Sequence, residues 1–199
     1  MSIVTLVSGG MDSSLMALMI KKEEITQYPL FIDYGQLCRD KELSACRAIH
    51  AIHSLSEPIV MDLSGFGNVI SCGITDKTKD IFADAFLPGR NMLFLLAGYA
   101  YAYHMDANAV AIGLLNEETH LFPDQTMQFV NQAESTLSLC TGRSIKILTP
   151  LMSFYKSDII RLAKRYGLTG TYSCHRGSEK HCGICVSCRE KFSALGKEV

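Results

Sequence analysis

The sequence predicts an α/β protein with a doubly wound, mostly parallel five-stranded sheet, helices on both faces and a small metal-binding segment at the C-terminus. Short runs of Val, Ile and Leu alternate with longer segments of helical periodicity, the pattern of parallel strands joined by crossover helices. A glycine turn separates the first such run from the first helix. Four of the eight cysteines fall within residues 174–188. We therefore expect a nucleotide-binding α/β domain at 1–168 and a cysteine-rich segment at 169–199.

The first strand is expected at 3–7, where β-branched residues form a buried run. The helix after it continues to Lys22. The later strands are expected at 28–33, 58–63, 109–113 and 145–148, and the later helices at 38–53, 91–105, 125–140 and 156–166, with a short last helix through Ala194. Residues 64–87 show no clean period and predict a long functional loop or lid.

The helix expected at 91–105 is apolar nearly all round, so it should be buried between the sheet and a second surface. Packing against a second copy of the chain is one such surface, and we expect a homodimer.

Composition excludes several classes of protein. The net charge is −1 and 48% of residues are apolar, as in a globular domain. No apolar run approaches the roughly 20 residues that span a bilayer, and the start of the chain lacks a basic leader. We expect a cytoplasmic protein that does not bind membranes.

The near-neutral total hides an asymmetry, because residues 1–150 carry a net charge of −6 and residues 151–199 carry +5. The basic segment would face a phosphate-bearing ligand or nucleic acid, or else compensate buried thiolates. This segment offers few basic residues for an RNA-binding surface, so we do not expect nucleic acid as a partner.

Residues 8–13 read Ser-Gly-Gly-Met-Asp-Ser and stand between the first strand and the first helix. Glycines let backbone N–H groups approach an anion, and the helix N-terminus adds partial positive charge. Ser13 and Ser14 can donate to phosphate oxygens, and Asp12 can hold Mg²⁺ or cap the turn. The alternative is an ordinary capped turn. The chain has neither a Walker lysine nor G-x-G-x-x-G here.

The clustered cysteines predict a metal site. Cys182, Cys185 and Cys188 are spaced C-x-x-C-x-x-C, and Cys174 precedes them. Four thiolates suit a closed, tetrahedral, structural Zn²⁺ site. An iron–sulfur cluster and a redox pair are the alternatives, and His175 or His181 would each be able to replace one thiolate.

Three further side chains are expected at the carboxyl edge of the sheet, where α/β proteins bind ligands. Arg90 opens the apolar helix beside Asn91, Asp33 ends the second strand and Lys156 opens the helix after the fifth. Arg90 and Lys156 are candidates for phosphate or carboxylate contacts. A surface arginine and an aspartate in a turn are the plainer alternatives.

The SGGMDSS stretch resembles the signature of the PP-loop ATP pyrophosphatases. Four further stretches follow it in order: FIDYGQ at 31–36, PGRN at 88–91, TPL at 149–151 and CGICVSCR at 182–189. With all five stretches in this order, the chain resembles the 7-cyano-7-deazaguanine synthase family. The resemblance implies an adenine-nucleotide-hydrolase-like fold and cleavage of ATP between its α- and β-phosphates, with Mg²⁺. It implies catalytic roles for Ser13, Asp12, Arg90 and Lys156. It implies ATP contacts from Ser8, Gly9, Gly10, Met11, Asp12, Ser13, Ser14, Asp33, Tyr34 and Gly113.

The resemblance further implies a ligase that adenylates the carboxylate of 7-carboxy-7-deazaguanine, amidates it with ammonia and dehydrates the amide to the nitrile. Residues 114–121 differ from the family's usual loop, which motivates an alternative in which the same base is transferred to a protein or another amine. A tRNA-modifying PP-loop enzyme is a further alternative. Substrate contacts are expected from Arg90, Asn91, Glu117, Glu118, Phe122 and Asp124. A carboxylate of Glu117 or Glu118 would accept both donors of a guanine-like edge.

Overall fold

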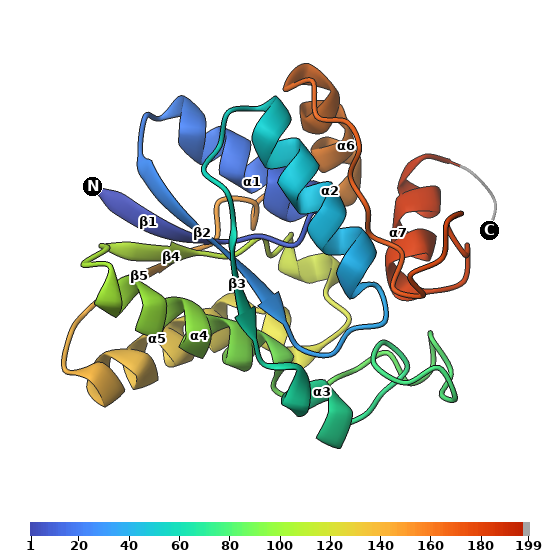
Figure 1. The fold of residues 1–199 in the computed structure, drawn as a ribbon, viewed down its shortest axis with the longest axis horizontal. Helices are drawn as coiled ribbons and strands as arrows, with labels where there is room; N and C mark the ends of the chain where they lie inside the picture. Colours follow the sequence, from blue (N-terminus) through green and yellow to red (C-terminus); the bar gives the residue numbers. More distant parts are fainter. Residues whose placement is uncertain (197–199) are drawn as a thin grey trace.

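The computed structural model describes residues 1–196, which build a single sheet of five parallel strands between two layers of helices (Figure 1). The last three residues of the expected segment 169–199 lie outside this range. The strands are β1 (Ser2–Leu6), β2 (Thr26–Asp33), β3 (Ile59–Asp62), β4 (Ala109–Ala111) and β5 (Lys146–Leu148), in the order β3-β2-β1-β4-β5. Every neighbouring pair is parallel. The predicted fold class is confirmed.

The strand order reverses beside β1, because β2 and β3 extend the sheet to one side and β4 and β5 to the other. At such a point the connections leaving β1 and β4 run to opposite faces and leave a crevice at the carboxyl edge. The glycine loop follows β1 and Gly113 follows β4. The topology therefore places the predicted phosphate loop in the crevice.

Helices cover both faces of the sheet (Figure 1). One face carries α1 (Met11–Lys22), α2 (Arg39–Ile52) and α6 (Lys156–Arg165), and the other carries α4 (Arg90–His104) and α5 (Met127–Thr141). Successive residues of β1 enter different cores, since Ile3 packs with Leu15 and Ala109 while Val4 packs with Leu95. Burial of both faces explains why the strands read as continuous apolar runs.

The structure adds detail to two expectations. Residues 64–87 contain a short helix, α3 (Ser64–Val69), and the rest is a long loop, as expected, anchored in the core by Ile74, Ile81 and Leu87, each at most 3% exposed. A role as a lid stays a prediction. The helix expected between the sheet and a second surface is α4, which packs one face on the sheet, while Leu96 and Tyr103 are 47% and 51% exposed. Within residues 1–196 nothing covers that outer face, and the homodimer that would cover it stays a prediction.

The last helix, α7 (Val186–Ala194), lies beyond the carboxyl ends of the strands with the cysteine-rich turns around it (Figure 1). Two short 3₁₀ turns, Glu117–Thr119 and Pro123–Gln125, occupy the loop expected after β4. Across residues 1–196, every helix is too short or too polar to cross a membrane.

Candidate active site

The loop after β1 is built around a glycine that no other residue can replace without movement. Gly9 has φ +77°, and a Cβ there would lie 2.4 Å from the carbonyl oxygen of Glu42 and 2.6 Å from the amide nitrogen of Cys46. The loop thus packs directly against α2. Ser8 and Ser13 hydroxyls lie 3.0 Å apart, and the Ser8 N–H donates to Ser13 Oγ over 3.1 Å. These contacts fix two hydroxyls at the N-terminus of α1, as an anion site requires.

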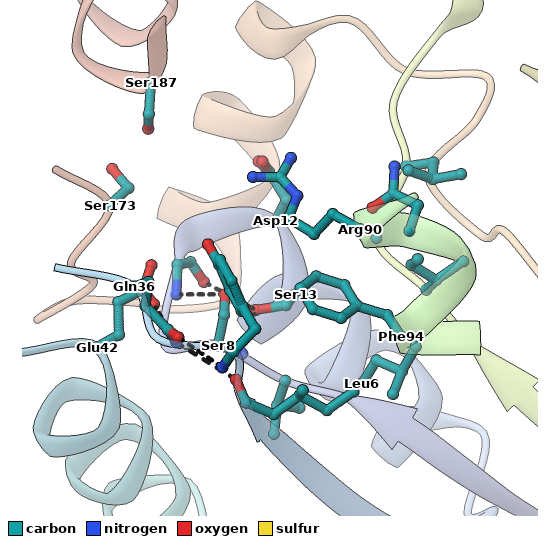
Figure 2. Close-up of a pocket in the computed structure, with 18 of the residues that line it drawn as sticks. Leu6, Ser8, Asp12, Ser13, Gln36, Glu42, Arg90, Phe94, Ser173 and Ser187 are labelled. Atoms are coloured by element: carbon teal, nitrogen blue, oxygen red, sulfur yellow. Dashed lines mark hydrogen bonds between the residues drawn. The ribbon is translucent and has the colours of Figure 1, made fainter. Parts of the chain in front are cut away.

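A cavity of about 250 Å³ opens over this loop. Its walls come from the ends of β1, β2 and β4, the start of α4, and residues of the cysteine-rich segment. Figure 2 shows Asp12 and Ser13 between Arg90 and Phe94 on one side and Ser173 and Ser187 on the other. The predicted residues that line it are Ser8, Gly10, Met11, Asp12, Ser13, Tyr34, Arg90, Asn91 and Gly113.

Gly113 brings the loop after β4 into contact with the phosphate loop. A Cβ at this position would lie 3.3 Å from the amide nitrogen of Ser13. Three predicted ATP contacts do not line the cavity. Gly9 packs on α2, Ser14 is buried inside α1, and Asp33 belongs to the polar network at the end of β2. The ATP contacts of Gly9 and Ser14 stay predictions.

Two of the predicted catalytic residues form an ion pair. Lys156 Nζ lies 2.8 Å from both carboxylate oxygens of Asp12 and 3.7 Å from Glu190 Oε2. Burial disfavours the charged lysine, but the two carboxylates outweigh it and raise the pKa of Lys156. Glu190, which the sequence analysis did not single out, links α7 to the base of α6. The pair joins segments that are 144 residues apart.

Arg90 and Asn91 are held at the start of α4. The Arg90 guanidinium lies 6.0 Å from the centre of the Tyr34 ring, within range of a cation–π contact. The Asn91 N–H donates to Asp124 Oδ2 over 3.2 Å, and its amide donates to the Asp124 carbonyl over 2.9 Å. Asp124 therefore positions the helix that carries Arg90.

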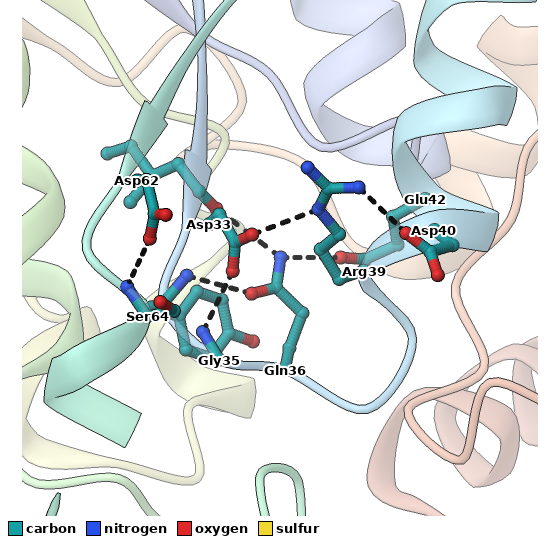
Figure 3. A network of polar contacts seen from close by, with 10 residues as sticks. Asp33, Gly35, Gln36, Arg39, Asp40, Glu42, Asp62 and Ser64 are labelled. Atoms are coloured by element: carbon teal, nitrogen blue, oxygen red, sulfur yellow. Dashed lines mark hydrogen bonds and ion pairs between the residues drawn. The ribbon is translucent and has the colours of Figure 1, made fainter. Parts of the chain in front are cut away.

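The end of β2 carries a polar network (Figure 3). Asp33 accepts from Arg39 Nε over 2.9 Å and from the Gly35 N–H over 3.0 Å, and it does not line the cavity. Its neighbour Gln36 accepts from the Tyr34 N–H and donates to Glu42 Oε2 over 3.3 Å. The predicted ATP contact Asp33 thus serves the turn, which was the plainer alternative, and its ATP contact stays a prediction.

Gln36 and Glu42 line the cavity and were missed as site residues. Burial raises the pKa of Glu42 to about 7. One signal was available, since Cys38, Glu42 and Cys46 recur at a spacing of four and put an acid on the buried stripe of a helix. Gln36 offered no comparable signal beyond its place in the FIDYGQ stretch.

The cysteine-rich segment supplies three more cavity residues, Ser173, His175 and Ser187. His175 Nδ1 is buried and has no hydrogen-bond partner among residues 1–196. Burial, aided by the positive charges of Arg90 and Lys156, lowers the pKa of His175 to about 4. The ring is therefore neutral at physiological pH.

The residues predicted to read a base lie outside the cavity lining. Glu117 Oε2 accepts from the Met127 N–H over 3.0 Å, and Glu118 accepts from the Tyr155 hydroxyl. Phe122 stacks on Phe86 with ring centres 5.0 Å apart. The base-reading role of these three residues stays a prediction, and the structure engages each of them elsewhere.

The four predicted metal ligands come together. The sulfur atoms of Cys174, Cys182, Cys185 and Cys188 all lie within 4.8 Å of one another. Zn–S bonds of about 2.3 Å in a tetrahedron place sulfur atoms about 3.8 Å apart, and Cys182 Sγ lies 4.0 Å from Cys188 Sγ. Backbone N–H groups donate to the sulfurs of Cys174 and Cys182, each over 3.4 Å. The donor set fits a metal ion with four thiolate ligands.

The two histidines proposed as substitutes differ in position. His181 Nδ1 lies 3.8 Å from Cys188 Sγ, whereas His175 lines the cavity. Since four sulfur atoms already lie within 4.8 Å of one another, neither ring is needed as a fourth ligand.

Solved structures resemble this fold at low sequence identity. NMN synthetase from Francisella tularensis matches with a TM-score of 0.55 and 15% identity, over 100% of this chain and 78% of that one. The U34-tRNA thiolase NcsA from Methanococcus maripaludis matches with a TM-score of 0.52 and 15% identity, over 98% of this chain and 64% of that one. At this identity the likeness supports the fold alone.

Relatives of higher sequence identity match nearly the whole length of the chain. The 7-cyano-7-deazaguanine synthase of Sulfurovum sp. is 33% identical, over 94% of this chain and 89% of that protein. The 7-cyano-7-deazaguanine synthase of Acetivibrio thermocellus is 34% identical, over 93% of this chain and 88% of that protein. A family model described as queuosine biosynthesis protein QueC matches residues 2–198. The chain therefore belongs to the QueC family of queuosine biosynthesis proteins.

Proposed function

We propose that the chain is an ATP-dependent synthase that converts the carboxylate of 7-carboxy-7-deazaguanine into a nitrile, with ammonia as the nitrogen source. One observation carries the proposal. The phosphate loop with Asp12, and Arg90, line a single cavity at the crevice of the sheet. Lys156 stands behind this wall, paired with Asp12. The relatives named as synthases supply the identity of the base.

A carboxylate resists attack by ammonia because its leaving group would be oxide. In the first half-reaction a carboxylate oxygen attacks the α-phosphorus of ATP, and pyrophosphate leaves. Ammonia then adds to the acyl carbon and AMP departs, which gives the amide after loss of a proton. In the second half-reaction the amide oxygen attacks the α-phosphorus of a second ATP. Loss of AMP and of both N–H protons leaves the nitrile. Each turnover therefore consumes two ATP and releases two AMP and two pyrophosphate.

The chain's own residues act by positioning and by electrostatics. The Ser8 and Ser13 hydroxyls and the N-terminus of α1 hold the departing pyrophosphate. Arg90 and Lys156 stabilise negative charge as it builds on the α-phosphate. The apolar cavity residues, among them Phe94, exclude water and so protect the activated acyl group from hydrolysis.

Asp12 is the acidic side chain of the phosphate loop and lines the cavity, so it would hold Mg²⁺. When bound, the ion neutralises phosphate charge. The four cysteines would hold Zn²⁺ in a structural site, because four thiolates leave no open position for water. That site orders the segment that supplies Ser173 and Ser187 to the cavity.

The experiment is incubation with ATP, Mg²⁺, 7-carboxy-7-deazaguanine and ammonium, followed by mass spectrometry of base and nucleotide products. We expect 7-cyano-7-deazaguanine, AMP and pyrophosphate. Formation of ADP and phosphate would refute the assignment of the phosphate loop. The alternative acceptor would be established by two results together: the base remains a carboxylate when ammonium is present, and it becomes attached to an amine of an added protein.

A further inference from the structure

Two acidic side chains line the cavity, Asp12 and Glu42, and they differ in what neutralises them. Asp12 is paired with Lys156 Nζ over 2.8 Å. Glu42, on α2, forms no ion pair among residues 1–196, although the residue is only 8% exposed. A buried carboxylate without a partner is costly. The described chain leaves Glu42 without the partner that a ligand can supply.

One oxygen of this carboxylate is held by the protein and the other is accessible. Glu42 Oε2 accepts from Gln36 Nε2 over 3.3 Å, and the Cys38 thiol, a weak donor, is near the same carboxylate. In the described chain, the polar side-chain atoms that are both buried and without a hydrogen bond are Thr5 Oγ1 and His175 Nδ1. Glu42 Oε1 accepts from no N–H or O–H of residues 1–196 and is not one of these two atoms. It therefore keeps accessible surface on the cavity that Glu42 lines.

Gln36 holds the carboxylate in this orientation and is itself fully engaged (Figure 3). Its Oε1 accepts from the Tyr34 N–H over 2.9 Å, and its Nε2 donates to the Ile32 carbonyl over 3.3 Å as well as to Glu42. The acceptor and both donors of the amide thus have partners inside the protein. Gln36 positions Glu42, and Glu42 presents the free acceptor.

The two sides of the cavity differ in charge. In Figure 2, Gln36 and Glu42 lie on one side of the phosphate loop, and Arg90 and Phe94 lie on the other. Tyr34 also lines the cavity, with its ring centre 5.2 Å from that of Phe94. Aromatic walls with a few placed polar groups are typical of sites for flat ring systems. The arrangement fits a ring that is negative at one end and presents N–H donors at the other.

The chemistry of the donor edge follows from the acceptor. An ionised carboxylate accepts and cannot donate, and it pairs best with two parallel N–H groups. A deazaguanine has such a pair, the ring N1–H and the exocyclic amine, and a carboxylate on its five-membered ring lies at the other end of the molecule. Adenine is a poorer match, because its amine stands beside a ring nitrogen whose lone pair would face the negative carboxylate of Glu42.

From these observations we propose that Glu42 is the specificity-determining residue that accepts hydrogen bonds from the N1–H and amine edge of the deazaguanine. The inference rests on the proposed function and deepens it, because it assigns the donor edge to the side of α2 and the reacting carboxylate to the side of Arg90. It differs from the prediction for Glu117 and Glu118, whose carboxylates accept from other partners outside the cavity lining.

Glu42→Gln tests this role with little change of shape. Gln36 Nε2 requires an acceptor, so the oxygen of the new amide takes the place of Oε2 and its NH₂ group faces the donors of the ligand. Glu57→Gln makes the same change in a side chain that is 77% exposed and is the matched control. The melting temperature of Glu42→Gln should not fall, because the substitution removes a buried charge that has no ion-pair partner among residues 1–196.

The ligands are 7-carboxy-7-deazaguanine, its analogue without the exocyclic amine (7-carboxy-7-deazahypoxanthine) and α,β-methylene-ATP. Their Kd values would be measured by calorimetry at about pH 8. Since burial raises the pKa of Glu42 to about 7, the carboxylate is mostly ionised there.

We expect Glu42→Gln to weaken binding of the deazaguanine by about 10- to 100-fold, the range for loss of a hydrogen bond to a charged group. The Kd of the ATP analogue should change by less than about threefold. Loss of the amine should weaken binding to the wild type by about 10-fold or more, and to Glu42→Gln by less than about threefold, because the acceptor for that amine is gone. Glu57→Gln should match the wild type with all three ligands.

Unchanged affinity of Glu42→Gln for the deazaguanine would overturn the proposal, and so would an equal cost of losing the amine in wild type and variant. Selective loss of the ATP analogue would overturn it by assigning Glu42 to the nucleotide. An unchanged Kd for the base with a raised KM for ammonium would overturn it by assigning Glu42 to the nitrogen donor. If the wild type binds the ATP analogue and not the deazaguanine, the proposed function fails and this inference fails with it, whereas the other results overturn the inference alone.

Discussion

Replacing Asp12 by Asn should destabilise the protein as well as inactivate it, because it leaves a buried lysine without its main partner. The side chain of Lys156 is 11% exposed and that of Asp12 is 29% exposed. Removing one partner of a buried ion pair costs about 3–5 kcal/mol, whereas exposed pairs contribute about 0–1 kcal/mol. Glu190 remains 3.7 Å from the lysine nitrogen and offsets part of the loss. We expect the free energy of unfolding to fall by about 2 kcal/mol, between those limits.

Urea unfolding with linear extrapolation measures this change in the free energy of unfolding. Two further variants test whether the change comes from the Asp12–Lys156 pair. Lys156→Met removes the charge that Asp12 compensates, so in that background Asp12→Asn should cost less than about 0.5 kcal/mol. Asp106 pairs with Arg143 over the same 2.8 Å but is 91% exposed, so Asp106→Asn should also cost less than about 0.5 kcal/mol. Equal costs of Asp12→Asn with and without Lys156 would refute the reasoning.

Three other predictions follow from single residues. The pKa of Glu42 in the folded protein is about 7, above its value near 4.3 in an unfolded chain. The folded state therefore binds the extra proton, and the free energy of unfolding falls by about 4 kcal/mol as pH rises between those values. Glu42→Gln should remove that fall, measured as the difference between the two urea curves at each pH, and parallel pH profiles would count against it. Cys185→Ser should lose the zinc and lower the melting temperature sharply, since binding energy of a structural metal is folding energy; a folded, active, zinc-free variant would contradict a structural role. Gly9→Ala should destabilise far more than Gly142→Ala, because both glycines have positive φ but only a Cβ at Gly9 would meet backbone within 4 Å; similar urea midpoints for the two variants would show that the loop can shift.

The fold was predictable because the central strands β1, β2 and β4 are largely buried and the helices that pack on the sheet carry apolar residues toward it, so the local pattern and the tertiary environment agree. The short helix α3 shows where that agreement ends. Its sequence holds two glycines, which disfavour a helix. It forms beside the end of β2, where the Gly67 N–H donates to the Tyr34 carbonyl over 3.0 Å, and a Cβ at Gly67 would lie 2.2 Å from that oxygen. Contact with a distant strand, absent from the local sequence, decides this element.

For the candidate site, too, the sequence predicted some residues and not others. Asp12, Arg90 and Lys156 were predicted correctly to lie at one edge, because parallel strands put all their following loops at the same end of the sheet. That rule predicts at which edge of the sheet a residue lies, but it does not predict the direction of its side chain. Glu117 and Glu118 follow β4 as expected, yet 3₁₀ turns direct their carboxylates to other partners. Glu190 was missed because only the packing of α7 against α6 brings it to Lys156.

The cysteine segment and the phosphate loop behave as one site. The Tyr172 N–H donates to the carbonyl of Gly9 over 2.9 Å, which joins the start of the cysteine segment to the loop itself. Near the other end of the cysteine segment, Glu190 Oε2 lies 3.7 Å from Lys156 Nζ. Between these two ties a metal ion bound by the four cysteines would hold the chain in place, and its loss would then release both ends of the cavity wall. The basic charge of residues 151–199 then has a second explanation beside compensation of thiolates, because Lys156 belongs to that segment and pairs with Asp12 of the phosphate loop.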